Sequence, residues 1–173
     1  MKFTIQPLTA EQAHAMIGWR YEPPYDNYNI VAADPQEEVA YLSNPENHYY
    51  GIVDAQKDLV GHCVFHEEGR VPGGDYTLDA LDIGIGMRPD WTGHGSGTEL
   101  ARAVFEFGIT RYQAQRLRAT VAAWNDRAQK VCTNNGFREV SRFVKSGTDR
   151  EFVILLKDVV LDLPHSSSSS RMD

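Results

Sequence analysis

Residues 87–98 read MRPDWTGHGSGT and connect a segment of extended character to a segment with helical periodicity. Gly93, Gly95 and Gly97 alternate in this stretch, and glycine allows a backbone to approach a ligand closely. The N–H groups that open a helix lack helical partners, and the helix dipole favours an anion at that end. The stretch therefore predicts a backbone cradle that can hold a phosphate or diphosphate group without a lysine.

Other interpretations of this stretch compete with the phosphate cradle. A P-loop is excluded because no Gly-Lys-Ser/Thr follows the glycines. The dinucleotide-binding fingerprint fits poorly, because the loop follows predicted antiparallel strands rather than a first βαβ unit. A flexible strand-to-helix turn without a ligand stays open at this point, as does a nucleotide-binding fold of another kind.

Hydrophobic periodicity and turn signals around the glycine stretch predict seven strands and four helices. The predicted strands cover residues 3–7, 49–54, 59–66, 76–87, 117–124, 137–145 and 151–157. The predicted helices cover residues 10–20, 35–43, 95–112 and 126–135. The second, third and fourth strands follow one another across polar turns, which predicts an antiparallel meander. We expect one α/β (α+β) domain over residues 1–163 and a disordered serine-rich tail over residues 164–173.

Composition limits the classes of function. The chain has 173 residues, 42% of them hydrophobic, which is enough for the core of one domain. Its 17 basic and 24 acidic residues give a net charge of −7, which disfavours a general nucleic-acid binder. No apolar run approaches the roughly 20 residues that span a bilayer, and no signal-peptide pattern opens the chain, so we expect a cytoplasmic protein without membrane association. Cys63 and Cys132 fit no disulfide framework, which agrees with a reducing compartment.

Two segments of the chain resemble a known family. Residues 87–97 have the pattern M-x-P-x-x-T-x-x-G-x-G, which is similar to the cofactor-binding motif Q/R-x-x-G-x-G/A of the GCN5-related N-acetyltransferase (GNAT) superfamily. Residues 125–137 begin with N-x-x-A and end with G-F, as does a second segment of that family. The predicted order of elements is also similar to the family's order over residues 2–157.

The resemblance implies both a fold and an activity. The fold is a mixed, mostly antiparallel, twisted sheet of seven strands with four helices, in which a central pair of strands splays apart. The activity is direct transfer of an acetyl group from acetyl-CoA to a primary amine, either a small amine or a protein N-terminus or lysine. The match is closest to bacterial members of the ribosomal-protein-acetylase-like kind. The implied partners are an acyl-CoA and an amine acceptor, and a homodimer stays open.

The resemblance also assigns residues to the cofactor. The pantetheine arm would insert between strands 76–87 and 117–124, beside the backbone of Met87. Thr92 stands where the family usually has Gln or Arg, which removes a polar side chain but leaves the backbone cradle intact. The assigned residues are Met87, Arg88, Thr92, Gly93, His94, Gly95, Ser96, Gly97, Thr98 and Asn125.

Three residues form the predicted catalytic group: Asp82, Cys132 and Asn125. Asp82 is the candidate general base, although period two places it on the opposite face from Met87 unless a bulge intervenes. A solvated or strand-pairing role for Asp82 stays open. Cys132 stands where many family members carry a proton-donating tyrosine, and its thiol is the candidate acid. That departure also leaves a second reading, a catalytically silent acyl-CoA-binding regulatory module.

A proline-containing aromatic loop over residues 21–29, together with Trp19 just before it, is the predicted acceptor site. Aromatic faces together with negative charge suit a cationic amine. The residues assigned to this role are Trp19, Tyr21, Glu22, Tyr25, Asp26 and Tyr28. Glu22 and Asp26 are also alternatives for the general base, and a rigid loop that only packs its aromatic rings over the sheet is the structural alternative.

The histidines predict no metal site. His62 and His66 lie four positions apart on a predicted strand, which separates them by about 13 Å at about 3.3 Å per residue. Two ligands at that distance cannot share one metal ion. We therefore expect no metal cofactor.

Overall fold

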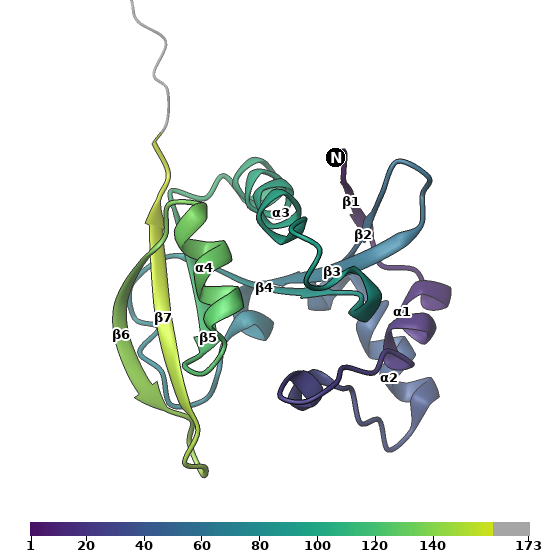
Figure 1. Ribbon diagram of the computed structural model, residues 1–173, viewed down its shortest axis with the longest axis horizontal. Helices are drawn as coiled ribbons and strands as arrows, with labels where there is room; N and C mark the ends of the chain where they lie inside the picture. The colour runs from purple at the N-terminus through teal and green to yellow at the C-terminus, as the bar shows by residue number, and fades with distance from the viewer. Residues whose placement is uncertain (161–173) are drawn as a thin grey trace, which may run out of the picture.

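Seven strands form one sheet in the computed structural model, which describes residues 1–160 (Figure 1). The strands are β1 (Thr4–Pro7), β2 (Tyr49–Val53), β3 (Leu59–Phe65), β4 (Leu81–Met87), β5 (Arg116–Ala122), β6 (Arg138–Val144) and β7 (Glu151–Asp158). Their order is β1-β2-β3-β4-β5-β7-β6, and every neighbouring pair is antiparallel except the parallel pair β4 and β5. The predicted mixed, mostly antiparallel sheet is confirmed. The tail predicted over residues 164–173 lies outside the described residues.

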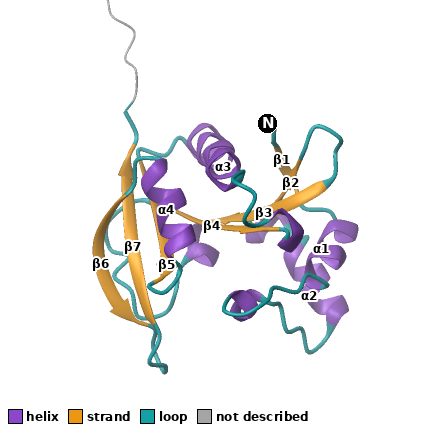
Figure 2. Cartoon of the chain, viewed as in Figure 1, coloured by secondary structure: helices purple, strands orange, loops and turns teal. Residues whose placement is uncertain are grey.

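Four α-helices accompany the sheet within residues 1–160 (Figure 2). The helices are α1 (Ala10–Ile17), α2 (Pro35–Leu42), α3 (Gly97–Tyr112) and α4 (Asp126–Asn134), with short 3-10 helices η1 (Tyr25–Tyr28), η2 (Pro45–Asn47), η3 (His66–Gly69) and η4 (Pro89–Trp91). Local signals set the helix starts: Thr9 and Gln12 form a capping box on α1, and Asp34 caps α2 ahead of Pro35. None of the helices in the described part of the chain combines the length and apolar character needed to cross a membrane.

The strand predicted over residues 76–87 is wrong in its first part, because β4 begins at Leu81. Asp75 accepts hydrogen bonds from the backbone N–H of Thr77 at 3.0 Å and from its hydroxyl at 2.6 Å. Such a side-chain contact offers the backbone a local turn in place of a sheet ladder. Residues 76–80 are therefore a connection that leads into a shorter strand.

The two pairs of helices cover opposite faces of the sheet. A Cβ atom built on Gly61 would lie 3.6 Å from Leu100, which places α3 over that face of β3. A Cβ atom on Gly51 would lie 2.9 Å from Gln12 of α1, and Gly51 pairs with His62, the neighbour of Gly61. Because successive strand residues alternate, α1 and α3 lie on different faces. The main core packs between the sheet and α3, and it includes Phe65, Leu81, Val104, Leu117 and Val153.

The central strands β4 and β5 separate after a short parallel contact (Figure 1). They pair only from Leu81 opposite Leu117 to Ile83 opposite Ala119. Beyond that point β4 stays paired with β3 up to Met87, and β5 stays paired with β7. The predicted splayed strand pair is thus present, and it leaves the second half of β4 without a neighbour on one side.

Candidate active site

The gap between β4 and β5 exposes backbone groups of β4. The backbone N–H of Arg88 donates to the carbonyl of Val60 at 2.8 Å, so the backbone N–H of Arg88 points toward β3. Because strand residues alternate in direction, Met87 and Ile85 direct their backbone groups into the gap. The Ile85 side chain is 37% exposed although β4 is a central strand. The gap therefore offers polar backbone and apolar surface side by side.

The glycine stretch forms a loop from η4 to α3 at the end of β4. Gly93 and Gly95 have φ angles of +80° and +84°, a left-handed conformation that favours glycine. A Cβ atom on Gly95 would meet nothing within 4 Å, so a ligand has room beside the backbone there. Ser96 precedes α3 without a side-chain hydrogen bond to its first turn. The first N–H groups of α3 are therefore free to bind an anion, and the helix dipole favours one.

Two arginines near this loop differ in what their side chains contact. The Arg88 guanidinium is held by the Asp90 carboxylate at 2.6 and 2.9 Å and by the Leu59 carbonyl at 2.8 Å. These contacts hold the side chain in place, and its contact with the cofactor stays a prediction. Arg127 of α4 lies with its Nη2 atom 3.9 Å from the position of a Cβ on Gly93. Sequence reasoning missed Arg127 because its only signal was its place in the first turn of α4.

The remaining loop residues predicted to bind the cofactor lie together between η4 and the first turn of α3. Thr92 donates its hydroxyl proton to the carbonyl of Pro89 at 2.7 Å, which stabilises the turn. The Thr98 hydroxyl accepts from the Asn134 amide at 3.3 Å and thereby connects α3 to α4. His94 is exposed at the surface of the loop.

The aromatic loop spans the ends of both separated strands. The Tyr21 hydroxyl donates to the carbonyl of Met87 at the end of β4 at 2.7 Å, and burial raises the pKa of this phenol to about 12. At the end of β5, Tyr28 accepts from the Asn125 amide at 2.9 Å and lies 5.8 Å from Trp124, ring centre to ring centre. Tyr25 lies 5.5 Å from the same tryptophan. The loop is therefore fixed on both sides of the gap.

Asn125 connects the start of α4 to the aromatic loop. Its side-chain oxygen accepts from the backbone N–H of Ala128 at 3.0 Å, which caps α4. Its side-chain nitrogen donates to Tyr28. Both ends of this buried amide therefore bind protein groups, so Asn125 positions the loop and the helix, and its cofactor and catalytic roles stay predictions.

Asp82 is unsuitable as the predicted general base. Its carboxylate accepts from Arg118 at 2.6 and 2.9 Å and from Arg70 at 2.8 Å, and its side chain is only 1% exposed. The register between β3 and β4 is regular through residues 83–87, so no bulge turns Asp82 toward the face of Met87. Both carboxylate oxygens are thus engaged by guanidinium groups inside the protein rather than directed at a substrate. The alternative role, in which Asp82 pairs with a residue of the neighbouring strand, describes this carboxylate better, because Arg118 lies on β5.

Cys132 is a core residue of α4. It is 6% exposed and belongs to the main hydrophobic cluster. Burial raises the pKa of its thiol to about 12, because a thiolate would lose its hydration there. A thiol that holds its proton this strongly is a poor donor to a departing thiolate, so the structure argues against the predicted acid role.

His62 is a residue of this site that sequence reasoning missed. It lies on β3 opposite Gly86, on the face that carries α1, and its ring lies 6.0 Å from that of Trp19. Its Nδ1 atom is buried and has no hydrogen-bond partner among the described residues. Burial lowers the pKa of this imidazole to about 4. The sequence placed His62 on a strand but gave no indication that Gly86 lies beside it.

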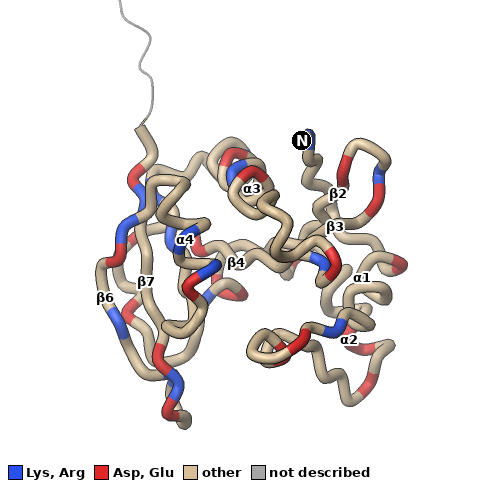
Figure 3. Tube along the Cα trace, viewed as in Figure 1, with Lys and Arg blue, Asp and Glu red and all other residues tan. Residues whose placement is uncertain are grey.

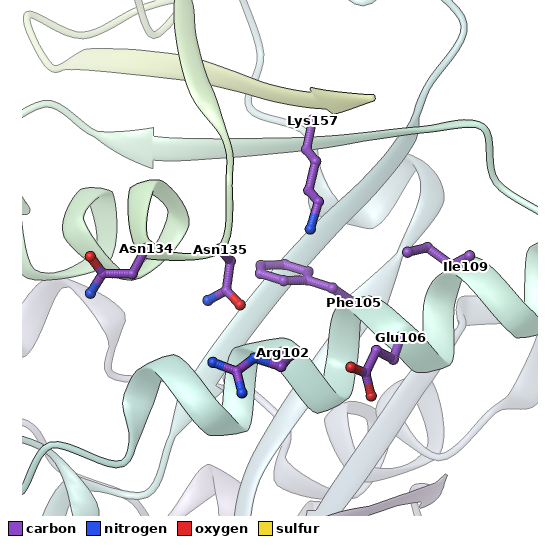
Figure 4. A pocket seen from close by; sticks show the side chains of 7 residues that line it. All are labelled: Arg102, Phe105, Glu106, Ile109, Asn134, Asn135 and Lys157. Carbon is purple, nitrogen blue, oxygen red and sulfur yellow. The ribbon is translucent and has the colours of Figure 1, made fainter. Parts of the chain in front are cut away.

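Two cavities lie outside the gap. One of about 280 Å³ lies between α3, α4 and β7, and Lys157 and Arg102 reach it from opposite sides (Figure 4). It is lined by Arg102, Phe105, Glu106, Ile109, Asn134, Asn135 and Lys157. The other, of about 660 Å³, lies beside His66, Tyr112 and Arg116. None of the residues assigned to the cofactor, the acceptor or catalysis lines either cavity.

Comparisons with known proteins agree with this geometry. The family described as the acetyltransferase (GNAT) domain matches residues 1–138. No match was found among curated proteins. Among solved structures, a GNAT-family acetyltransferase from Bacillus anthracis is 17% identical with a TM-score of 0.71, and the alignment covers 91% of this chain and 95% of that one.

Two other similar structures carry a stated acceptor. A chimeric spermidine N-acetyltransferase from Vibrio cholerae and hSSAT is 19% identical with a TM-score of 0.66, covering 91% of this chain and 96% of that one. Mutant forms of the spermidine/spermine N-acetyltransferase SpeG from Vibrio cholerae are 18% identical with a TM-score of 0.65, covering 91% and 95%. At these identities the likeness concerns the fold alone.

Proposed function

This chain belongs to the acetyltransferase (GNAT) family, and from that premise we propose that it transfers an acetyl group from acetyl-CoA directly to a primary amine. The observation that carries the proposal is the gap between β4 and β5 with the glycine loop and the free start of α3 at its end. The diphosphate of acetyl-CoA would lie at residues 93–98, and its pantetheine arm would replace the missing strand beside Ile85 and Met87.

The open space beside the glycine loop and the polar and apolar groups of the gap both support the binding of acetyl-CoA. The open surroundings of Gly95 admit a diphosphate, and Arg127 adds positive charge beside Gly93. Ile85 supplies an exposed apolar side chain for the arm. The backbone N–H groups that point into the gap match the amide carbonyls of a pantetheine arm in the way that a neighbouring strand would.

The reaction needs no acyl-enzyme. The neutral amine attacks the thioester carbonyl carbon and a C–N bond forms. One N–H bond of the amine breaks and releases its proton to water, and the C–S bond breaks with its electron pair remaining on sulfur. Backbone N–H groups of Ile85 and Met87 stabilise the negative charge that develops on the oxygen. The thiolate takes its proton from solvent, because the buried Cys132 thiol is a poor donor.

A cationic amine is the acceptor class that charge favours. Residues 3–56 contain Arg20 as their single basic residue and eight acidic residues, Glu11, Glu22, Asp26, Asp34, Glu37, Glu38, Glu46 and Asp54. Figure 3 shows the acidic positions along α1, α2 and the neighbouring loop. The Glu22 and Asp26 side chains are exposed and make no ion pair with any described residue. A field of this sign attracts and orients a cation near the aromatic loop.

Thiol release from acetyl-CoA tests the proposal. The assay would use spermidine, an aminoglycoside, and a peptide whose N-terminus and lysine are free. Amine-dependent release of CoA, with an acetylated amine detected by mass spectrometry, is the expected result. Acetyl-CoA binding without turnover for every amine would favour the silent regulatory module instead. A melting temperature that rises with ATP or NAD but not with acetyl-CoA would contradict both.

The subtype of acceptor stays a prediction. The GNAT family match does not separate enzymes for small amines from those for protein N-termini, so the ribosomal-protein-acetylase-like subtype rests on the sequence resemblance alone. The homodimer also stays a prediction.

A further inference from the structure

The Arg127 side chain lies where the two parts of the site meet. Arg127 belongs to the first turn of α4, which follows β5, whereas Gly93 belongs to the loop that follows β4. The Nη2 atom of Arg127 lies 3.9 Å from the position of a Cβ atom on Gly93. The guanidinium carbon of Arg127 lies 4.7 Å from the ring centre of Tyr25, in the aromatic loop. One side chain thus lies beside both the glycine loop and the predicted acceptor loop.

The N–H groups of Arg127 are free for a ligand. The Arg127 side chain is exposed, and it makes no ion pair within residues 1–160. A guanidinium carries five N–H donors in one plane, and it can stack on an aromatic ring while the N–H groups at its edge bind a phosphate. The contact with the Tyr25 ring therefore leaves the edge of the Arg127 guanidinium available.

The surroundings of this edge suit a phosphate. Gly95 lies two residues after Gly93, and a Cβ atom on Gly95 would meet nothing within 4 Å. The start of α3, whose first N–H groups lack helical partners, follows directly. The diphosphate placed at residues 93–98 in the proposed function would therefore lie within reach of the Arg127 guanidinium, which can bind its oxygens by charge-assisted hydrogen bonds.

The charge of Arg127 affects the aromatic loop as well. Tyr25 lies in the loop between Glu22 and Asp26, whose carboxylates would attract a cationic amine. A positive charge beside Tyr25 opposes that attraction. A diphosphate bound to Arg127 would neutralise this charge and hold the guanidinium in place against the ring. The amine would then meet a more negative and better ordered loop.

We propose that Arg127 couples the binding of the two substrates: its edge binds the diphosphate of acetyl-CoA while its face stays on Tyr25, so that each substrate strengthens the binding of the other. The proposal rests on the proposed function and deepens it. The coupling is reciprocal, because acetyl-CoA must raise the affinity for the amine by the same factor as the amine raises the affinity for acetyl-CoA. Arg127 acts on binding, so its loss should raise the KM for the amine far more than it lowers kcat.

Calorimetric titration of spermidine, or of the best amine from the screen, measures the coupling without turnover. The amine is added to the protein alone and to the protein saturated with CoA, which carries the diphosphate but no acetyl group. In the unchanged protein, CoA should lower the Kd of the amine by about 5-fold or more. In Arg127→Gln, CoA should leave the Kd of the amine nearly unchanged.

Arg111→Gln is the matched control. Arg111 is also an exposed arginine over a tyrosine ring, with its guanidinium carbon 5.7 Å from the ring centre of Tyr112, but it lies at the opposite end of α3 from the glycine loop. Its coupling factor should equal that of the unchanged protein. Both arginines are exposed, so both variants should keep the melting temperature of the unchanged protein.

A second measurement needs no amine. Arg127→Gln should weaken CoA binding by about 10-fold through loss of charge-assisted hydrogen bonds. Tyr25→Leu should weaken it by about 3-fold, because Arg127 loses the ring that holds it. Tyr25→Leu should have no further effect in the Arg127→Gln protein, since the two residues act as one unit. Additive losses in the double variant would contradict the proposal.

The outcomes separate this inference from the proposed function. An equal amine Kd with and without CoA in the unchanged protein, or undiminished coupling in Arg127→Gln, would overturn the coupling role of Arg127 even if acetyl transfer is observed. Coupling that is present and lost in Arg127→Gln, without turnover for any amine, would support the inference and contradict the proposed function alone.

Discussion

Gly95 and Gly147 share a local conformation but differ in their surroundings in the folded chain. Both have positive φ angles, +84° and +76°, and a Cβ atom on either would meet nothing within 4 Å. Gly95 lies in the loop before α3, whereas Gly147 lies in the turn between β6 and β7. The pair therefore separates the cost of backbone strain from the cost of blocking a ligand.

Gly95→Leu should weaken acetyl-CoA binding by about 10-fold or more, because the side chain would fill the space proposed for the diphosphate. Gly147→Leu carries the same strain, on the order of 1 kcal/mol, and should leave the affinity unchanged. Titration calorimetry with acetyl-CoA measures both. Equal affinities in the two variants would remove the diphosphate from this loop.

Asp82 and Arg118 form a buried ion pair, and a substitution that breaks it should lower the stability of the protein. Their side chains are 1% and 2% exposed, so Asp82→Asn leaves a buried guanidinium without its counter-charge. Breaking such a pair costs about 3 kcal/mol or more. The free energy of unfolding in urea should fall accordingly. The exposed pair of Glu139 and Arg142 gives the control, since Glu139→Gln should have little effect.

A stable but inactive Asp82→Asn protein would contradict this structural role. It would instead restore Asp82 as a candidate base.

His62 also predicts a pH dependence of stability. Its folded-state pKa of about 4 lies below the ordinary value near 6.5, because burial disfavours the charged ring. The unfolded chain therefore binds the proton more readily between these two values, and the unchanged protein loses stability as the pH falls through that window. His62→Phe lacks this loss. Its advantage in unfolding free energy should be larger at pH 5 than at pH 7, and urea titrations at both values measure it.

At the scale of elements, the aromatic loop holds the two separated strands by one tyrosine at each. Tyr21 contacts the end of β4, and Tyr28 contacts Asn125 at the end of β5. Neither strand end has a strand neighbour across the gap. The loop therefore links the two strand ends across the gap.

Tyr21→Phe tests the connection to β4. Loss of the hydroxyl contact with the Met87 carbonyl should cost about 1 kcal/mol of stability and raise the KM for the amine several-fold. Tyr41→Phe is the control. It removes the hydroxyl of an α2 tyrosine that contacts Glu68, and it should leave the KM for the amine unchanged. An unaltered KM for Tyr21→Phe would exclude the loop from acceptor binding.

Local sequence signals predicted most elements, but they missed the turn before β4 and the separation of β4 from β5. The capping box of Thr9 and Gln12 and the Asp34-Pro35 start were readable because they act within one turn. The segment 76–80 reads as strand by composition, but its Asp75 and Thr77 contact makes a turn. The separation of β4 from β5 had no local signal, and only the resemblance to the family indicated it.

At the scale of the whole molecule, the negative charge of the first third predicts salt dependence. With a single arginine against eight carboxylates, residues 3–56 should attract a cationic amine through a long-range field. Salt screens such a field over about 10 Å at 0.1 M ionic strength. The KM for spermidine should therefore rise several-fold between 0.05 and 0.5 M salt. An uncharged aromatic amine is the control, and an equal change for both would contradict steering.

The sequence by itself determined the kinds and order of the elements, the glycine loop before α3 and the family, because these depend on periodicity and on residue types at short spacing. Only the tertiary structure decided which polar groups meet. Asp82 became a partner of Arg118, Asn125 a helix cap and Cys132 a core residue. His62 entered the site because β3 pairs with β4 in a register that sets its ring against Gly86. That register is a balance of contacts between residues far apart in the chain, and no local pattern encodes it.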